Sequence, residues 1–515
     1  MTLITPAQIA KALDEVTHSA RDHIVRTGDI SRETREVLCH TKWLREIIRG
    51  YYILTNPCAE DNETTVWQGV YWNFLSVYLK DRFENNYVLS PENSLDIHTR
   101  NTILPIQIVL QTTMGGQGET RLPQGHSLFS YRVSEKKMPF LIESHEGIRV
   151  YPLELALAKV GPSFFEKNVE NAQIALRVLD VQKLARYILD GEAPMASVER
   201  LYQGLIETGK KGNAERLRAS LKIGGILLHD KNVALGVNEK KERVLSPHAE
   251  RIKLMWKSMR ETVIEIFPVM PGIKSDMKSN ILDSIEDIYA NDAYHSLSIE
   301  GYKVTKELIE QVRMGAWNSE NPKDRQQIDA MAAKGYMEAF HAVKESISKV
   351  FDGENAATIF ENDLTSWFTA MFSPSIQCGL LKASDLAGYR NKPVYIRNSR
   401  HVPPSYDALM DCMEALFECL TNEPHAGVRA VLGHFIFTFI HPFHDGNGRI
   451  GRFLMNLMLV SGGYPWTIIR SEREHRAKYL QSLEQASVDR KIDDFCRMVV
   501  TEMAVDWSSL ELVRK

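Results

Sequence analysis

Residues 441–452, His-Pro-Phe-His-Asp-Gly-Asn-Gly-Arg-Ile-Gly-Arg, decide how the C-terminal part of this chain folds. They separate two apolar runs, Val428–Ile440 and Phe453–Val460, which contain no proline and a single glycine. Apolar runs of this kind predict two buried helices. The sequence of residues 446–448, Gly-Asn-Gly, predicts the turn between them, because glycine and asparagine adopt positive φ at little cost.

The same turn has the chemistry of an anion site. We expect the second helix to begin near Gly448–Arg449 and to end at Gly462-Gly463, and the first N–H groups of a helix have no partner within it. With the helix dipole they attract anions. Arg449 and Arg452 are three apart and share one helix face, Asp445 offers a hard oxygen ligand, and the preceding helix ends at a histidine. The combination predicts a site for phosphate transfer.

Two other interpretations of this stretch stay open at this point. The first is a plain helix corner with a glycine-rich turn and solvated arginines, which explains each residue singly but not their combination. The second is a metal-dependent hydrolase that uses His441, His444 and Asp445 as nitrogen and oxygen ligands. A hydrolase of that kind has no evident use for two arginines at this spacing.

The stretch 441–452 resembles the active-site motif of the Fic (filamentation induced by cAMP) family, HxFx(D/E)GNGRxxR, at every fixed position. Most members of that family transfer AMP from ATP to a hydroxyl side chain of a protein, and some transfer other nucleotides or phosphocholine. The resemblance covers residues from about 247 to the C-terminus. It implies an all-helical Fic domain with a β-hairpin flap, which takes ATP and Mg²⁺ and acts as a protein adenylyltransferase on Ser, Thr or Tyr.

The resemblance also implies a role for each position of the motif. His441 would be the general base that accepts the proton of the target hydroxyl. Phe443 would anchor the loop in the core, and Asp445 would hold Mg²⁺. The remaining positions would bind the phosphates of ATP, through the backbone, the Asn447 side chain and two guanidinium groups: Gly446, Asn447, Gly448, Arg449 and Arg452.

A second motif lies ahead of the first. Ser296-x-x-x-Glu300-Gly301 resembles the family's inhibitory motif, (S/T)xxxE(G/N). Taken alone, a glutamate before a glycine also fits an ordinary helix C-terminus. By the resemblance, Glu300 would form a bidentate pair with Arg452, which would draw the guanidinium away from the γ-phosphate. Some members use this glutamate to position water, so de-AMPylation is implied as a variant.

Two further segments of the C-terminal half carry predictions. Gly388–Arg397 predicts a turn and a strand, and in family terms residues 388–403 form the flap, an edge hairpin on which the protein target docks. The alternative is an ordinary surface excursion. After the motif, Arg473–Ala486 and Ile492–Val505 predict helices. Tyr479 on the first of them would lie near the nucleotide base or, alternatively, in the core.

Residues 1–60 predict a winged helix-turn-helix. Ser31 caps a helix over Arg32–His40, Thr41 caps a second over Lys42–Arg49, and Gly50–Leu54 is strand-like. The alternative is a small helical lobe with a solvated face, because glutamates interleave the basic residues. The phosphate contacts of a winged helix would be Arg32, Arg35, Lys42, Arg45 and Arg49.

Residues 61–245 predict an α+β region. Its strands are expected at Leu104–Thr112, Leu128–Arg132 and Gly147–Val150, and its helices at Glu154–Lys159 and Val178–Ile188. A charge run at residues 239–243 closes it. The layout resembles the AbiEi-like winged-helix antitoxin and regulator proteins. That resemblance implies an alternative function, a DNA-binding regulator whose Fic domain senses nucleotide.

Bulk properties bound the remaining choices. A chain of 515 residues predicts several domains, which we place at 1–60, 61–245, 246–350 and 351–515. Its net charge of -4 argues against a protein that coats nucleic acid, though not against a local basic face. Six cysteines without a CxxC pattern indicate reduced thiols and a cytoplasmic location. We expect neither a signal peptide nor a membrane partner; the sequence leaves the target and the oligomeric state open.

Overall fold

The computed structural model describes residues 4–19, 23–57, 64–139, 142–223, 226, 228, 246–273, 278–315, 324–381 and 388–505. The chain divides into two compact units. One comprises Met1–Pro247 with Tyr395–Val402, and the other comprises His248–Val394 with Pro403–Lys515. Cys58, the charge run at 239–243 and the predicted boundaries at 60 and 245 lie outside the described residues.

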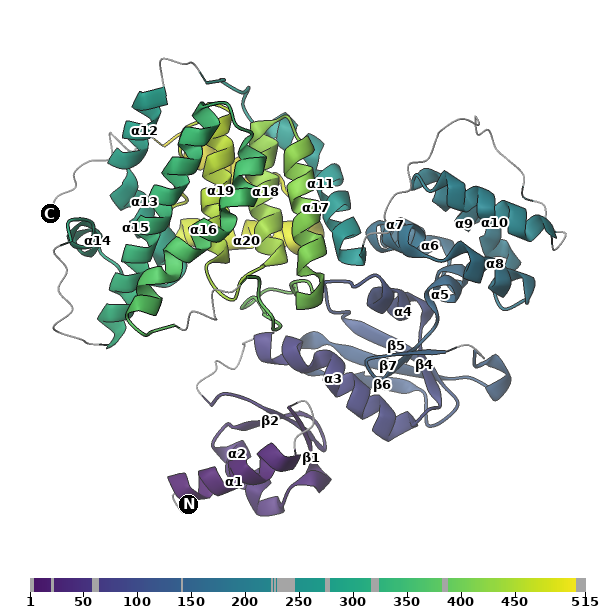
Figure 1. Cartoon of the computed structure of the whole chain (residues 1–515). Helices are drawn as coiled ribbons and strands as arrows, with labels where there is room; N and C mark the ends of the chain where they lie inside the picture. Colours follow the sequence, from purple (N-terminus) through teal and green to yellow (C-terminus); the bar gives the residue numbers. More distant parts are fainter. Residues whose placement is uncertain are drawn as a thin grey trace. The chain divides into compact units, whose positions relative to one another are not determined.

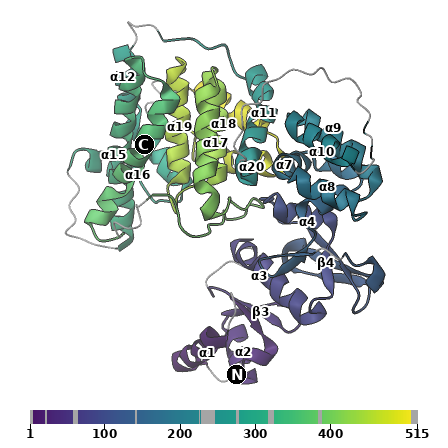
Figure 2. The same ribbon diagram turned by 45° about the vertical axis from the view of Figure 1, so that its right-hand side comes forward.

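The second unit is helical (Figure 1), as the sequence predicts. α18 and α19 pack against each other, and so do α15 and α16, an arrangement that Figures 1 and 2 show from two sides. The helices of this region are α11 (Pro247–Ile266), α12 (Lys278–Asp287), α13 (Tyr289–Ile299), α14 (Lys306–Arg313), α15 (Asp324–Phe351), α16 (Ala356–Gln377), α17 (Leu409–Asn422), α18 (Ala426–Ile440), α19 (Asn447–Ser461), α20 (Arg473–Asp489) and α21 (Asp493–Met503).

α18 and α19 form the core of this unit, and both predictions for them are confirmed. Nearly every residue of each helix is buried, which explains why the apolar runs show no amphipathic period. α19 begins one residue before its expected start and ends just before Gly462. α15 and α16 approach closely where Gly335 lies on the Met371 carbonyl oxygen, a contact that a Cβ atom would prevent.

The predicted flap hairpin is wrong for the residues described. Residues 388–400 form turns and loop, and the only β contact of the segment is an isolated bridge between His401 and Ile103. Other groups of the first unit bind its backbone. The Val402 N–H donates to the Thr102 carbonyl at 2.7 Å, and the Asn398 N–H donates to the Thr64 hydroxyl at 3.1 Å. The backbone N–H groups of residues 398 and 402 are therefore already bonded within the first unit, and they do not pair with a second strand of a hairpin.

The first 57 residues form two helices and a sheet. The elements are α1 (Pro6–Ser19), β1 (Ile24–Arg26), α2 (Arg32–His40), β2 (Leu44–Ile48) and β3 (Tyr51–Leu54), with strand order β1-β3-β2. The predicted α2 is confirmed, and the Ser31 hydroxyl accepts from the Thr34 N–H at its start.

The predicted helix over Lys42–Arg49 is wrong, because those residues form β2 of a hairpin with β3. Lys42 at φ 62° ends the helical path after α2, and Gly50 at φ 93° makes the turn. Leu44 and Ile47 are buried while Arg45 and Glu46 are more exposed. The helix-turn-helix order therefore fails at its second helix, and the winged helix stays a prediction.

The rest of the first unit is a mixed α/β region. The predicted strands appear as β5 (Gln107–Thr112), β7 (Ser127–Arg132) and β9 (Ile148–Val150), and a four-stranded sheet has the order β4-β5-β7-β6. The predicted helices appear as α5 (Leu153–Lys159) and α8 (Val181–Leu189). The other elements are α3 (Thr64–Phe83), β4 (Tyr87–Leu89), α4 (Pro91–His98), β6 (Gly118–Arg121), β8 (Glu143–His145), α6 (Pro162–Lys167), α7 (Val169–Val178), α9 (Val198–Glu207) and α10 (Lys211–Ile223).

α3 is a long helix that the sequence pattern does not reveal. Its side chains share an apolar core with those of the sheet strands. Aromatic and β-branched residues, which favour strands, fill much of it, and buried residues occur around most of its circumference. Within the described part of the chain, no helix is both long and apolar enough to cross a membrane.

Candidate phosphate-binding site

His441 follows the last turn of α18 in a left-handed conformation, with φ 53° and ψ 58°. This backbone geometry turns the chain out of the helix. The imidazole Nδ1 lies 3.1 Å from the Thr438 carbonyl, to which it donates, and this leaves Nε2 as the acceptor. Burial lowers the pKa of His441, so the ring is neutral at pH 7. The geometry and the protonation state both suit a general base.

The turn before α19 holds its shape through Gly446 and Asn447. Gly446 caps the helix at φ 83°, where a Cβ atom would lie 2.9 Å from the Phe372 ring. The Asn447 side chain accepts from the Phe443 N–H at 2.9 Å and donates to the Phe443 carbonyl at 2.8 Å. Both polar atoms of this side chain close the loop, and its predicted contact with phosphate stays a prediction.

Phe443 anchors this loop as predicted. Its ring stacks on Phe368 of α16 with centroids 3.9 Å apart and planes 9° apart. The side chain is buried. The loop therefore starts from a fixed point in the core, which holds the residues after it at the start of α19.

Arg449 is a buried cation with unused hydrogen-bonding capacity. Its side chain is 1% exposed, and one guanidinium nitrogen lies 3.0 Å from Asp445 Oδ2. Its Nε has no hydrogen-bond partner among the described residues. Burial works to lower the pKa of Arg449, but Asp445, Tyr302 and Glu300 outweigh it and raise that pKa. The group stays charged and can still donate to an anion.

Arg452 is bound by two residues of the predicted inhibitory motif, Ser296 and Glu300. Its Nε donates to the Ser296 hydroxyl at 2.9 Å, and Nη2 donates to the Ser296 carbonyl at 3.0 Å and to Glu300 Oε1 at 2.7 Å. The structure therefore contains the predicted contact between Glu300 and Arg452. It is not the bidentate pair that we expected: one carboxylate oxygen accepts from one nitrogen, and the other acceptors are Ser296 and the Tyr479 hydroxyl.

Glu300 also lies over the first turn of α19. A Cβ atom on Gly448 would overlap Glu300 Oε1, so the carboxylate is in direct contact with the helix N-terminus. A negative charge is stabilised at that position by the helix dipole. The carboxylate thus occupies the place where the sequence predicts a phosphate.

A Schellman motif fixes the end of the inhibitory helix. α13 ends at Ile299, Gly301 follows at φ 90°, its N–H donates to the Ser298 carbonyl, and the Tyr302 N–H donates to the Leu297 carbonyl. Gly301 thus ends α13 as the glycine of an ordinary helix C-terminus does, which is the alternative interpretation of this motif. The motif also aims Glu300 at the site, so the two interpretations are compatible.

Tyr479 does not lie where the resemblance implies. It is buried, packs on Phe495, and its hydroxyl lies 2.9 Å from His434 Nε2. The same hydroxyl accepts from Arg452 Nη1 at 3.4 Å. The predicted contact with a nucleotide base is wrong, because the ring belongs to the core beneath Arg452.

Sequence reasoning missed Arg390, which supports the backbone at the base. Its side chain is buried, its Nε donates to the His441 carbonyl at 2.8 Å, and its own N–H donates to the Pro442 carbonyl at 2.9 Å. It lies in the non-helical segment before the motif, where no periodicity marks it. The same loop also holds Lys392, Arg397 and Arg400, so no signal in the sequence distinguishes Arg390 from its cationic neighbours.

The hydrolase interpretation finds no support in the site. Among the described residues, no group of three His, Cys, Asp or Glu side chains could hold a metal ion. Asp445 therefore offers one carboxylate, which is the arrangement that Mg²⁺ uses when phosphates and water complete its shell. The donor set fits a nucleotide-bound Mg²⁺ ion and not a protein-held catalytic metal.

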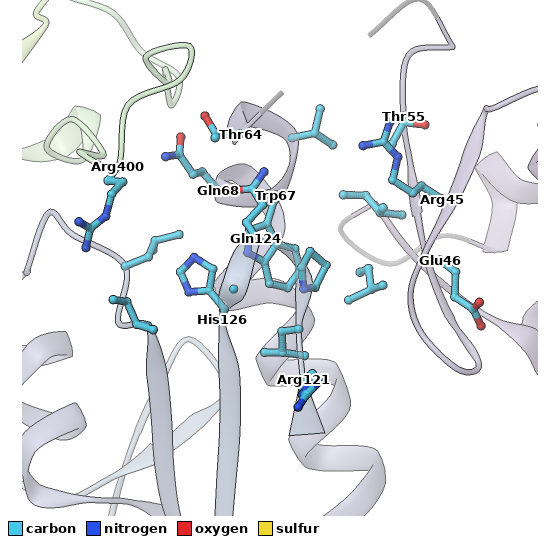
Figure 3. Close-up of a pocket in the computed structure, with 18 of the residues that line it drawn as sticks. Arg45, Glu46, Thr55, Thr64, Trp67, Gln68, Arg121, Gln124, His126 and Arg400 are labelled. Carbon is cyan, nitrogen blue, oxygen red and sulfur yellow. The ribbon is translucent and has the colours of Figure 1, made fainter. Parts of the chain in front are cut away.

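The first unit contains a separate cavity of about 900 Å³. Figure 3 shows Arg45 from β2, Arg121 from the end of β6 and Arg400 from the segment 395–402 around it. Two buried polar atoms of its lining, Trp67 Nε1 and Gln68 Oε1, have no hydrogen-bond partner among the described residues. Of its lining residues, Arg45 is one of the predicted phosphate contacts of the winged helix, and Arg400 lies in the predicted flap segment.

The site thus combines a buried pair of arginines at a glycine-capped helix start with a neutral histidine at the end of the preceding helix. Residues 370–459 match the model of the Fic/DOC family. The C-terminal half of this chain therefore carries a Fic domain.

Two curated relatives named protein adenylyltransferase Fic match part of this chain. The protein adenylyltransferase Fic of Aedes aegypti is 27% identical over 261 residues, which are 46% of this chain and 48% of that protein. Its namesake in Nematostella vectensis is 39% identical over 124 residues, 23% of this chain and 28% of that protein. A solved chain of Fic-1 from C. elegans covers 68% of this chain and 94% of its own length, at 18% identity and a TM-score of 0.36. The chain thus spans less than half the length of these two curated relatives.

Proposed function

We propose that this protein is an Mg²⁺-dependent protein adenylyltransferase that transfers AMP from ATP to a hydroxyl side chain of a target protein. The observation that carries the proposal is the meeting of three groups at the start of α19. Arg449 keeps a buried donor unpaired, Arg452 lies one turn further on, and His441 presents a neutral imidazole. This arrangement suits transfer of a phosphoryl-linked group to a neutral nucleophile.

The chemistry assigns a distinct task to each residue. His441 Nε2 accepts the proton of the target hydroxyl while that oxygen forms a bond to the α-phosphorus of ATP. The bond from the α-phosphorus to the pyrophosphate oxygen breaks, and pyrophosphate leaves. Arg449, Arg452 and the free N–H groups of α19 stabilise the charge on the phosphates. Asp445 would hold Mg²⁺, which supplies further charge neutralisation when bound.

Glu300 is proposed to hold this site in an inhibited state. Its carboxylate accepts a hydrogen bond from Arg452 Nη2 and lies against Gly448. It therefore competes with the γ-phosphate for the guanidinium and for the start of α19. Like charges at this distance repel, and a carboxylate and a phosphate cannot share one guanidinium edge without cost. The same carboxylate is placed to orient water, whose oxygen would bond to the phosphorus of an AMP–protein linkage while the bond to the target oxygen breaks and AMP leaves. Hydrolytic removal of AMP is therefore a second proposed activity of the site.

The proposal is tested by incubating the purified protein with radiolabelled ATP, Mg²⁺ and a cell lysate, followed by mass spectrometry. Three proteins are compared: wild type, Glu300→Gly, and Glu300→Gly combined with His441→Ala. We expect label on proteins with Glu300→Gly and none with the double variant. Label from GTP, UTP or CDP-choline in place of ATP would change the group transferred. The absence of label with every donor would contradict the proposed activity.

The second candidate is DNA binding by the first unit, and the cavity favours it through its three arginines and single acidic residue, Glu46. One predicted phosphate contact is less available, because Arg32 forms an ion pair with Glu36 at 2.7 Å. Binding to DNA phosphates would weaken steeply with salt as counterions return. We expect Arg121→Ala to reduce the slope of log affinity against log salt by about one. A slope that does not change would remove Arg121 from the interface.

A further inference from the structure

Tyr302 is a residue of the phosphate site that neither motif includes. It follows Gly301 directly, and the hydrogen bond from its N–H to the Leu297 carbonyl fixes its backbone at the end of α13. Its ring lies under the Arg449 guanidinium, with Cζ 5.2 Å from the ring centroid. Its hydroxyl donates to Asp445 Oδ2 at 3.5 Å. One side chain therefore touches both the predicted metal ligand and a predicted phosphate ligand.

The contacts of Tyr302 leave Asp445 and Arg449 paired with each other. Asp445 Oδ1 accepts from the Gly446 N–H at 2.5 Å, and Oδ2 receives both the Tyr302 hydroxyl and the Arg449 guanidinium. Phe372 offers Arg449 a second ring at 5.1 Å. Each carboxylate oxygen therefore has a partner, although the Asp445 side chain is 59% exposed, and the arginine's charge is directed at a carboxylate instead of at a phosphate.

We propose that Tyr302 is a second brake on nucleotide binding, separate from Glu300, which holds Arg449 on Asp445 and so masks the Mg²⁺ ligand and the phosphate ligand together. The inference rests on the proposed function for the identity of the ligand, Mg²⁺-ATP. Glu300 acts on Arg452, whereas Tyr302 acts on the other arginine and on the metal carboxylate. Only Gly301 separates the two, so movement of one turn would release both.

Charge and desolvation favour this direction of the effect. A cation over an aromatic face is attracted to the ring, and the attraction grows when water is excluded, as it is at Arg449. An anionic phosphate gains no such attraction from the ring or from the tyrosine hydroxyl's bond to Asp445. Binding of Mg²⁺-ATP must therefore break the Tyr302 contacts, and their removal in advance should raise affinity.

The test is calorimetry of ATP binding to wild type, Tyr302→Ala and Tyr302→Phe, with Mg²⁺ and with EDTA. We expect Tyr302→Ala to bind Mg²⁺-ATP about two- to tenfold more tightly, from the usual strength of such contacts. The gain should shrink in EDTA, because part of it comes from freeing Asp445. Tyr302→Phe keeps the ring and loses the hydroxyl, so we expect a smaller gain.

Tyr294→Ala is the matched control. Tyr294 lies on α13, is half-buried like Tyr302, and carries its own cation, Lys306, at 5.9 Å from the ring. Its removal should leave ATP affinity unchanged. Unchanged or weaker Mg²⁺-ATP binding by Tyr302→Ala, with a melting temperature close to that of wild type, would overturn the brake. If Tyr302→Ala is unstable, Tyr302→Phe replaces it in the test, and unchanged or weaker Mg²⁺-ATP binding by Tyr302→Phe would overturn the brake.

Measuring ATP binding and AMP transfer separately distinguishes a failure of this inference from a failure of the proposed function. In a Glu300→Gly background, Tyr302→Ala should still raise Mg²⁺-ATP affinity, because the two residues act on different arginines. If Glu300→Gly labels no protein while Tyr302→Ala still tightens binding, adenylyl transfer fails and the brake stands. If Glu300→Gly labels its targets and the affinity gain vanishes in that background, Tyr302 acts only through Glu300 and the second brake is wrong.

Discussion

The site at the start of α19 and the cavity of the first unit both collect arginines, but in opposite ways. In the site, Arg449 and Arg452 are 1% and 4% exposed, and each faces a carboxylate. In the cavity, Arg121 and Arg400 are exposed. A buried guanidinium is costly unless it is paired or coordinated, so its presence needs a reason. An exposed guanidinium costs little free energy of folding, so the presence of arginines in the cavity is weaker evidence for a function.

The largest expected effect comes from His441→Ala in the Glu300→Gly background. Without the base, transfer should fall about 10²- to 10⁴-fold, the usual contribution of general base catalysis. ATP affinity should change little, because the imidazole acts on the incoming hydroxyl. Single-turnover labelling and calorimetry on the same preparations check both halves. Transfer at the rate of the parent variant would show that His441 is not the base and would weaken the contrast with the cavity.

The next effect is the release of Arg452 by Glu300→Gly. A hydrogen bond between charged groups is worth about 2–3 kcal/mol when partly buried, which corresponds to a gain in transfer of roughly thirty- to a hundredfold. Arg452→Ala should not reproduce the gain, because it removes the phosphate contact as well. The double variant should be as slow as Arg452→Ala alone. A melting curve separates the alternatives, since a purely structural glutamate would lower stability and leave the rate unchanged.

The contrast between the two regions also explains what the sequence could reveal. The spacing of His441, Asp445, Arg449 and Arg452 is local, so one turn between two helices brings them together. The contact of Glu300 with Arg452 joins distant segments, and only the family resemblance suggested it.

The roles of Tyr302 and Arg390 were not predicted, because each depends on packing between elements, and for the same reason the sequence could not decide between the two positions that it allowed for Tyr479. The strand β2 was misread as a helix because Lys42 ends the helical path with a left-handed conformation that its residue type does not signal. The aromatic α3 was missed because its residue types favour a strand. The sequence therefore predicted which chemical groups lie close together along the chain, but it did not predict which side chains from other elements surround them.

A smaller effect concerns the pH dependence of stability in the second unit. Burial lowers the pKa of His434 from 6.5 to about 3. The unfolded chain therefore takes up a proton below pH 6.5 that the folded unit refuses until about pH 3. Stability from this group is complete above pH 6.5 and is lost as the pH falls toward 3, by at most about 1.4 kcal/mol per pH unit.

His434→Gln should reduce that acid sensitivity. Denaturation midpoints at pH 7, 6 and 5 check it, and the difference between wild type and variant is the quantity to follow. Asp292 has the opposite sign, because burial raises its pKa to about 6 and stability rises as that carboxyl is protonated. Below pH 6 the loss of stability from His434 and the gain from Asp292 partly cancel in wild type. His434→Gln removes the loss, so the gain from Asp292 should be more visible in that variant. Equal slopes in the two proteins would contradict the assignment.

The smallest expected effect sharpens the comparison most directly. The exposed Arg121 side chain makes no hydrogen bond or ion pair among the described residues, so Arg121→Ala should change the free energy of unfolding by less than about 0.5 kcal/mol. Arg452→Ala leaves the buried Ser296 and the partly exposed Glu300 carboxylate without their donor, and it should cost several times more, about 2–3 kcal/mol. Denaturant unfolding of the two variants gives both numbers. A loss of stability with Arg121→Ala that approaches that of Arg452→Ala would mean that the cavity arginines support the fold, and the distinction between a buried, paired site and an exposed, open one would no longer hold.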